Sequence, residues 1–172
     1  MNGTIILLGG NNSSNAIWLN ELGASLSVMY DIHILRYKHW DLNDVEIDFD
    51  IEKKRLRSYI KKCKKPYYFV AKSAGAILAM KCIADDTLSP KQCVFIGTPI
   101  EWATEKGIEY LSLLGQNKVD TLYIQATSDP MGSADKLKAI IGDRPSLARF
   151  KSDNHYYEDI QYLFDTIANF LK

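Results

Sequence analysis

The stretch that decides the fold is Tyr67–Ala79, which runs Tyr-Tyr-Phe-Val-Ala-Lys-Ser-Ala-Gly-Ala-Ile-Leu-Ala. Its first four residues are aromatic or β-branched and follow Pro66, so they predict a buried strand. A helix is expected at Ala76–Ala84. The residues between them, Ala71–Gly75, predict a sharp strand-to-helix turn with Ser73 at its apex. Small residues around this serine allow the strand and the helix to come close together.

The overall composition sets limits on the class of protein. At 172 residues the chain is long enough to bury one large core. Its 21 basic and 21 acidic residues balance, so neither nucleic acid nor a membrane is the expected partner. The cysteines Cys63, Cys82 and Cys93 have no metal-ligand spacing, which favours reduced thiols in a cytoplasmic protein. The N-terminal apolar run is too short for a signal peptide or a membrane span.

Apolar runs that end in turn residues recur along the chain and predict strands. The expected strands are Thr4–Leu8, Ile32–Tyr37, Tyr67–Val70, Cys93–Ile96, Thr121–Ala126 and Leu147–Lys151. The other expected helices follow a cap at Ser13 or Ser14 and lie at Ile51–Lys64, Ala134–Ile141 and Tyr156–Leu171. This alternation predicts an α/β fold, a three-layer sandwich whose mainly parallel central sheet has about six strands. The acidic segment Asp41–Asp50 is expected to be a loop or short turn.

Residues suited to catalysis follow three of the expected strands. Ser73 comes after the third strand, Asp129 after the fifth and His155 after the sixth. In parallel α/β sheets the active crevice lies at the carboxyl ends of the strands, so we expect these side chains to meet. An imidazole can take the proton of a serine hydroxyl, and a carboxylate can hold the imidazole in the required tautomer.

The pentapeptide Ala-Lys-Ser-Ala-Gly at 71–75 resembles the Gly-x-Ser-x-Gly nucleophile elbow of the α/β-hydrolase superfamily, with Ala71 in place of the first glycine. The chain order Ser73, Asp129, His155 is also the order of that superfamily. The resemblance implies a catalytic triad in which Ser73 is the nucleophile, His155 the base and Asp129 the acid that orients it.

The resemblance covers nearly the whole chain. It implies one small α/β-hydrolase domain over residues 1–172, without the N-terminal antiparallel strands of larger relatives. Large lids in this superfamily usually follow the strand after the elbow. In this chain that stretch is about 97–120, with room for one short lid-like helix and its loops, so a shallow site is expected.

The resemblance also implies an oxyanion hole made by two backbone N–H groups. One belongs to Ala74, and the other comes from the glycine-rich loop after the first strand, with Asn11 preferred over Asn12. That loop is also compatible with an anion cradle or with a plain glycine turn. Trp102 and Tyr156 are expected to border the pocket, because their segments adjoin the active edge of the sheet.

Other residues compete for each catalytic role. Ser73 has the alternative of simply capping the helix that follows it. Asp135 and Asp153 are rivals for the acid, although Asp135 resembles an acid of the first helical turn. His33 and His39 are rivals for the base, but they lie in or near the second strand, at positions the superfamily does not use.

The basic stretch Lys53–Lys65 contains eight Lys or Arg residues. Apolar residues are interleaved at helical spacing, which favours the solvent-exposed face of an amphipathic helix over a nucleic-acid patch.

The elbow and the order of the expected triad favour a serine hydrolase of the esterase or thioesterase type. It would act on a small-molecule ester or thioester with no metal or organic cofactor. The alternatives are an acyltransferase with the same triad and a hydrolase-fold protein that binds a ligand or partner without turnover.

Overall fold

The computed structural model describes residues 2–42, 46–143 and 146–171. The strands of this part of the chain form a single six-stranded sheet. They are β1 (Thr4–Leu8), β2 (Asp31–Leu35), β3 (Tyr67–Lys72), β4 (Cys93–Ile96), β5 (Thr121–Ala126) and β6 (Ser146–Phe150). All neighbouring strands pair in parallel, in the order β2-β1-β3-β4-β5-β6. The predicted fold class, with its parallel central sheet, is confirmed.

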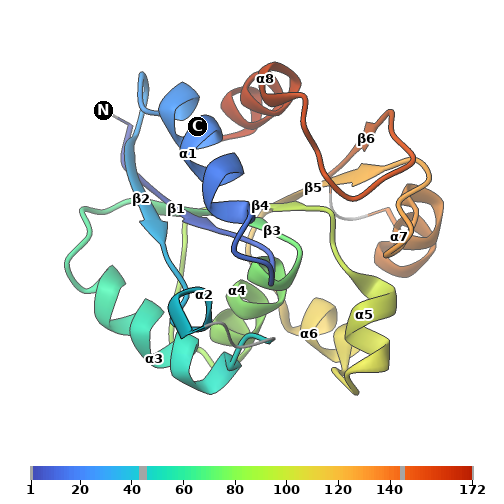
Figure 1. Ribbon diagram of the computed structural model, residues 1–172, viewed down its shortest axis with the longest axis horizontal. Helices are drawn as coiled ribbons and strands as arrows, with labels where there is room; N and C mark the ends of the chain where they lie inside the picture. The colour runs from blue at the N-terminus through green and yellow to red at the C-terminus, as the bar shows by residue number, and fades with distance from the viewer. Residues whose placement is uncertain (1, 43–45, 144–145, 172) are drawn as a thin grey trace.

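Helices cover both faces of this sheet (Figure 1). They are α1 (Asn15–Leu26), α2 (His39–Leu42), α3 (Phe49–Ile60), α4 (Ala74–Ala84), α5 (Ile100–Glu105), α6 (Tyr110–Gln116), α7 (Ala134–Ile141) and α8 (Ile160–Phe170). On one face α1 packs against α8, and on the other α4 packs between α3 and α6. None of the helices in the described ranges has the length and apolar character needed to cross a bilayer.

The centre of the sheet lies in the hydrophobic core. Every residue of β1, β3, β4 and β5 is buried, as expected for strands covered on both faces. Nearly every residue of α4 is buried as well. The turn between β3 and α4 is therefore held between two elements of the core.

The chain changes direction at β1, which gives the sheet its switch point. β1 pairs with β2 on one side and with β3 on the other. The connections that leave β1 and β3 pass to opposite faces of the sheet, through α1 and α4 (Figure 1). A crevice opens where two such connections part, at the carboxyl ends of the strands.

Some boundaries in the first half of the chain differ from those predicted. β2 ends before Tyr37, because this side chain turns into the core and donates a hydrogen bond to the Gly9 carbonyl at 3.0 Å. The expected loop Asp41–Asp50 contains the end of α2 and the start of α3, and residues 43–45 lie outside the described residues. The side chain of Asp48 caps α3, whereas Ser14 makes no side-chain cap to α1.

Two differences occur in the second half. The lid-like segment at 97–120 contains two short helices, α5 and α6, rather than one, and Gly107 with φ of 65° lies between them. The terminal helix begins at Ile160 rather than at Tyr156. The residue that delays it is Tyr157, whose φ of 59° is incompatible with a right-handed helix.

Candidate active site

Ser73 lies in a strained turn between β3 and α4. Its φ is 52° and its ψ is −120°, a conformation that residues with a side chain rarely adopt. The Ser73 N–H donates to the Ile96 carbonyl, and the Ala76 N–H donates to the Ser73 carbonyl, both at 2.9 Å. The Ser73 side chain makes no cap hydrogen bond to α4, so the helix-cap alternative is wrong.

Gly75 allows the start of α4 to touch the end of β1. A Cβ atom at this position would lie 2.6 Å from the Gly9 carbonyl oxygen and 2.8 Å from the carbonyl carbon and oxygen of Leu8. The Leu8 atoms belong to the backbone of a fully buried strand and Gly9 follows it directly, so they cannot move aside without disturbing the sheet. The glycine requirement therefore comes from the close contact with the end of β1.

We predict that Gly75→Ala lowers the free energy of unfolding by at least about 2 kcal/mol, because the added methyl overpacks against backbone. Urea denaturation followed by circular dichroism measures this loss. Gly115→Ala is the matched control, since a Cβ at Gly115 meets nothing within 4 Å and alanine is the better helix former. Equal losses at the two positions would contradict the close contact with β1.

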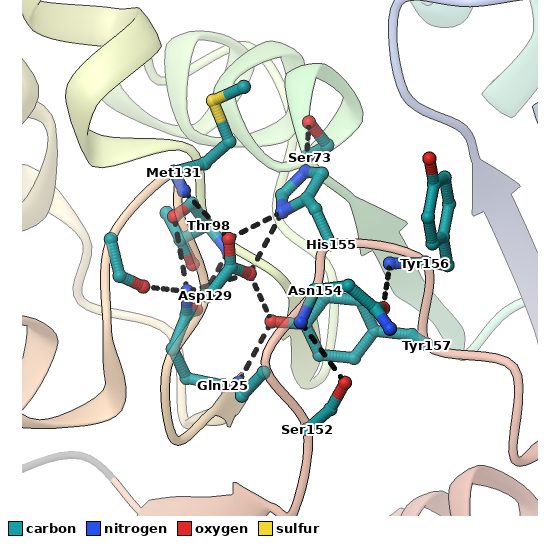
Figure 2. A network of polar contacts seen from close by, with 12 residues as sticks. Ser73, Thr98, Gln125, Asp129, Met131, Ser152, Asn154, His155, Tyr156 and Tyr157 are labelled. Carbon is teal, nitrogen blue, oxygen red and sulfur yellow. Dashed lines mark hydrogen bonds and ion pairs between the residues drawn. The ribbon is translucent and has the colours of Figure 1, made fainter.

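The structure brings Ser73, His155 and Asp129 into one hydrogen-bonded row (Figure 2). Nε2 of His155 lies 3.0 Å from Oγ of Ser73, and Nδ1 lies 2.8 Å from Oδ2 of Asp129. The three residues follow β3, β6 and β5, and parallel strands deliver them to one edge of the sheet. The arrangement suits proton transfer from the serine hydroxyl to the imidazole.

Asp129 is fixed as an acceptor on both of its oxygens. Its side chain is fully buried, and Oδ1 accepts the Met131 N–H at 2.8 Å. Oδ2 accepts the hydroxyl of Tyr157 at 2.6 Å and a longer bond, 3.4 Å, from Nε2 of Gln125. Burial, followed by the hydrogen bond to Asp129 and the charge of that carboxylate, raises the pKa of Tyr157 well above its ordinary value. The tyrosine is therefore protonated and donates to the carboxylate.

Tyr157 connects the site to three other parts of the fold. Its hydroxyl oxygen accepts the Ala126 N–H at 2.9 Å, and its carbonyl accepts Nε1–H of Trp18 at 2.8 Å. A Cβ at Gly97 would lie 2.5 Å from the Tyr157 ring and 3.1 Å from Cε1 of His155, so glycine clears the space that both rings occupy. Sequence reasoning missed the role of Tyr157, because the helical spacing of the terminal segment places this residue in the last helix.

The two expected oxyanion residues line the same cleft as Ser73. Ala74 is the first residue of α4, where backbone N–H groups have no acceptor within the helix. The loop at Asn11 is held in place by its own hydrogen bonds. Its carbonyl accepts Nε2–H of His39 at 2.7 Å, and its Oδ1 accepts the Ile47 N–H at 2.7 Å. His39 thus supports the loop instead of facing the serine.

The remaining rivals lie elsewhere. His33 lies within β2, between the hydroxyl of Tyr59 at 3.1 Å and the carboxylate of Asp31 at 3.3 Å. Asp135 is exposed and accepts a hydrogen bond from Arg149, and the Asp153 residue is exposed as well. Among the residues that the structure describes, none of these three rivals lines the cleft.

The row opens into a cleft of about 520 Å³, within the range of small-molecule sites. Its apolar walls come from Ile17, Trp18, Pro99, Trp102, Met131 and Tyr156. The expected pocket residues Asn12, Trp102 and Tyr156 are all part of the lining. Of the lid-like segment, α5 contributes to the cleft, whereas the described residues of α6 pack against α4 and line none of it.

The described part of the chain contains no group of three or more His, Cys, Asp or Glu residues positioned to hold a metal ion.

Comparison with known proteins finds solved structures of similar fold. No model of a known protein family matches the chain, and no curated protein matches it. Solved structures do match. One is a protein from Xanthomonas campestris pv. campestris, described as a hydrolase of the alpha/beta superfamily. It has a TM-score of 0.77 and 16% identity, and the match covers 99% of this chain and 97% of that one.

A second match is the esterase domain of a Rhodothermus marinus protein, with a TM-score of 0.73, 11% identity, and coverage of 98% of this chain and 85% of that chain. A third is an uncharacterized protein from Bacillus cereus ATCC 10987, with a TM-score of 0.75 and 16% identity. The match covers 98% of this chain but only 60% of that protein. These likenesses show that the chain has the α/β-hydrolase fold.

Proposed function

We propose that this protein is a serine hydrolase that cleaves a small ester or thioester through an acyl-enzyme intermediate. The observation that carries the proposal is the row Ser73, His155, Asp129, with 3.0 Å from hydroxyl to imidazole and 2.8 Å from imidazole to carboxylate. The strained turn at Ser73 supports it, because such a turn presents the hydroxyl at the top of the sheet. Structural neighbours that are hydrolases and esterases support the reaction class.

The first half of the reaction forms the acyl-enzyme. Oγ of Ser73 attacks the carbonyl carbon of the substrate while Nε2 of His155 takes the hydroxyl proton. Asp129 accepts the Nδ1–H of the imidazole, which leaves the Nε2 lone pair facing the serine and stabilises the imidazolium that forms. His155 then gives its proton to the departing alcohol or thiol.

The oxyanion of the tetrahedral intermediate needs hydrogen-bond donors that are already in position. We assign this role to the backbone N–H of Ala74, at the positive end of α4, and to an N–H of the loop after β1. Asn11 is the preferred donor in that loop and Asn12 the second choice. The bonds from His39 and Ile47 fix the loop before the substrate binds, so that little reorganisation is needed.

The second half releases the acid. Water enters the site, His155 takes one of its protons, and the hydroxide attacks the acyl carbon. The resulting intermediate collapses, and Oγ of Ser73 leaves with the proton that His155 returns. The enzyme is regenerated with one carboxylic acid and one alcohol or thiol formed per water consumed.

A fluorophosphonate probe tests the proposal directly, because it forms a covalent bond only with an activated serine. We expect one probe per chain, mapped to Ser73 by mass spectrometry, together with turnover of p-nitrophenyl acetate. Urea-unfolded protein is the control and should not react. A folded protein with neither labelling nor turnover of any ester or thioester would favour the alternative of ligand binding without catalysis.

The shape of the cleft predicts a preference for short or compact acyl groups. The six residues of α5 span only about 9 Å, enough for one wall but not for a roof. Two of the apolar wall residues, Ile17 and Tyr156, are themselves 68% and 65% exposed. Each buried CH₂ adds about 0.8 kcal/mol, but only while there is apolar wall to cover it. We therefore expect kcat/KM to level off or fall beyond a few carbons.

A series of p-nitrophenyl esters from acetate to palmitate measures this preference, with hydrolysis by Ser73→Ala protein subtracted as background. A steady rise of kcat/KM through the long chains would contradict the open cleft and would require a lid that closes over the substrate.

A further inference from the structure

Lys72 is a buried lysine in the wall of the cleft. It is the residue directly before Ser73, its relative exposure is 7%, and it lines the cleft. Its Nζ lies 5.4 Å from the ring centroid of Trp18 and 3.1 Å from Oδ1 of Asn15. Both of these residues line the cleft together with Lys72. Lysine is almost never buried to this degree unless it is paired.

The partners of Lys72 do not neutralise its charge. The hydrogen bond to Asn15 is to a neutral amide, and in the described part of the chain the ammonium forms no ion pair. An ammonium group has three donors, and an amide oxygen satisfies one. Burial lowers the pKa of Lys72 to about 8, against a smaller opposing effect of the Asp129 charge. At neutral pH the ammonium is therefore mostly charged and buried, and no described carboxylate forms an ion pair with it, which is costly.

We propose that Lys72 forms an anion subsite beside Ser73 and that the preferred substrates carry a carboxylate. This inference rests on the proposed ester hydrolysis and names the class of ester. A carboxylate on the substrate would complete the ion pair in a partly desolvated cleft, where such pairs are stronger than in water. A single charge fits better than a doubly charged phosphate, because the acidic Glu21 and Glu158 line the same cleft.

The position of the carboxylate within the substrate follows from the shared cleft. Ser73 and Lys72 both line it, so one molecule can present a carbonyl to Ser73 and a carboxylate to Lys72. The number of carbon atoms between the two groups is the variable that a series of dicarboxylate monoesters measures.

The first experiment compares charged and neutral esters of equal chain length. Monoethyl succinate, glutarate and adipate are set against ethyl butanoate, pentanoate and hexanoate, and ethanol release gives kcat/KM for each. We expect at least one charged ester to exceed its neutral partner by about tenfold or more, equivalent to one ion pair of about 1.4 kcal/mol. A second arm compares acetoxyacetate and 3-acetoxypropanoate with ethyl acetate, which places the carboxylate on the leaving group instead.

The matched variants are Lys72→Met and Lys81→Met. Methionine keeps the apolar stem but removes the charge, so Lys72→Met should abolish the charged-to-neutral ratio. Lys81 also lies over an aromatic ring, 5.4 Å from the centroid of Phe49, but does not line the cleft, so its variant should keep the ratio. A purely structural lysine would lower stability without changing the ratio, and this result would overturn the proposal.

The ratio should also depend on pH. Lys72 is charged below its pKa of about 8 and neutral above it, so the preference for charged esters is present at pH 7 and declines as the pH rises through 8. Asp129 and His155 face the same region, as do Glu21 and Glu158. Asp129 and His155 act on charged and neutral esters alike through catalysis. Glu21 and Glu158 act on the charged ester, as Lys72 does, and comparison with Lys72→Met isolates the contribution of the lysine.

A binding measurement separates this inference from the proposed function. Ser73→Ala protein labelled with ¹³Cε-lysine is titrated by NMR with monoethyl glutarate or ethyl pentanoate. We expect the charged ester alone to raise the pKa of Lys72. If this shift occurs without any ester hydrolysis by the wild type, the subsite stands and the hydrolase proposal fails. Hydrolysis of neutral esters with no charge preference and no shift would instead overturn the subsite alone.

Discussion

Ser73→Ala is expected to lower kcat for p-nitrophenyl acetate by about 10⁴–10⁶-fold, because it removes the group that forms the acyl-enzyme. The remaining rate would come from water attacking a substrate held at the oxyanion donors. Labelling by the fluorophosphonate probe should be lost completely. The free energy of unfolding should change little, since alanine keeps the Cβ atom and has the same backbone strain at a φ of 52°.

Ser133→Ala is the control for this change. Ser133 is a true helix cap, whose Oγ accepts the Lys136 N–H at 3.2 Å, and its loss should cost about 1 kcal/mol of stability with little effect on turnover. The two serines thus give opposite patterns of activity and stability. Equal probe labelling of wild type and Ser73→Ala, with the label mapped to another residue, would falsify the assignment of the nucleophile.

The strands, and the meeting of Ser73, His155 and Asp129 at one edge of the sheet, could be predicted from the sequence because both depend on local patterns. Continuous apolar runs such as Thr4–Leu8 have few alternatives to a strand covered on both faces. Ser73 and Asp129 follow such strands and His155 follows the edge strand β6, and a parallel sheet leaves all three one edge at which to meet. The turn at 71–75 could be predicted because small residues surround a serine between an expected strand and an expected helix.

The backbone conformation of Tyr157 and the burial of Lys72 could not be predicted from the sequence, because long-range contacts determine both. The helical spacing of the terminal segment assigned Tyr157 to a helix, but its φ of 59° goes with bonds to Trp18, Ala126 and Asp129, all distant in sequence. A lysine before the serine has no local sign of burial. Its burial results from the side chains that α1 packs over the end of β3.

The second large effect is expected for Asp129→Asn. In this variant kcat should fall by about 10³–10⁴-fold, with a smaller change in KM. The carboxylate accepts at both oxygens, from the Met131 N–H on one and from Tyr157 and His155 on the other. An amide has one accepting end and one donating end, so in either orientation a donor faces a donor. If the NH₂ group faces His155, Nδ1 must become the acceptor. The proton then moves to Nε2, where it blocks the uptake of the serine proton.

Asp135→Asn and Asp153→Asn are the matched controls, since both carboxylates are exposed and neither lines the cleft. Each should change kcat less than about twofold, because surface substitutions away from such networks have small effects. Urea denaturation of all three variants separates lost activity from lost folding. If Asp129→Asn is fully folded and active while Asp153→Asn or Asp135→Asn is impaired, the acid of the row has been assigned to the wrong residue. Loss of kcat in folded Asp129→Asn alone would leave the imidazole tautomer as the physical cause, because the buried carboxylate controls which nitrogen faces Ser73.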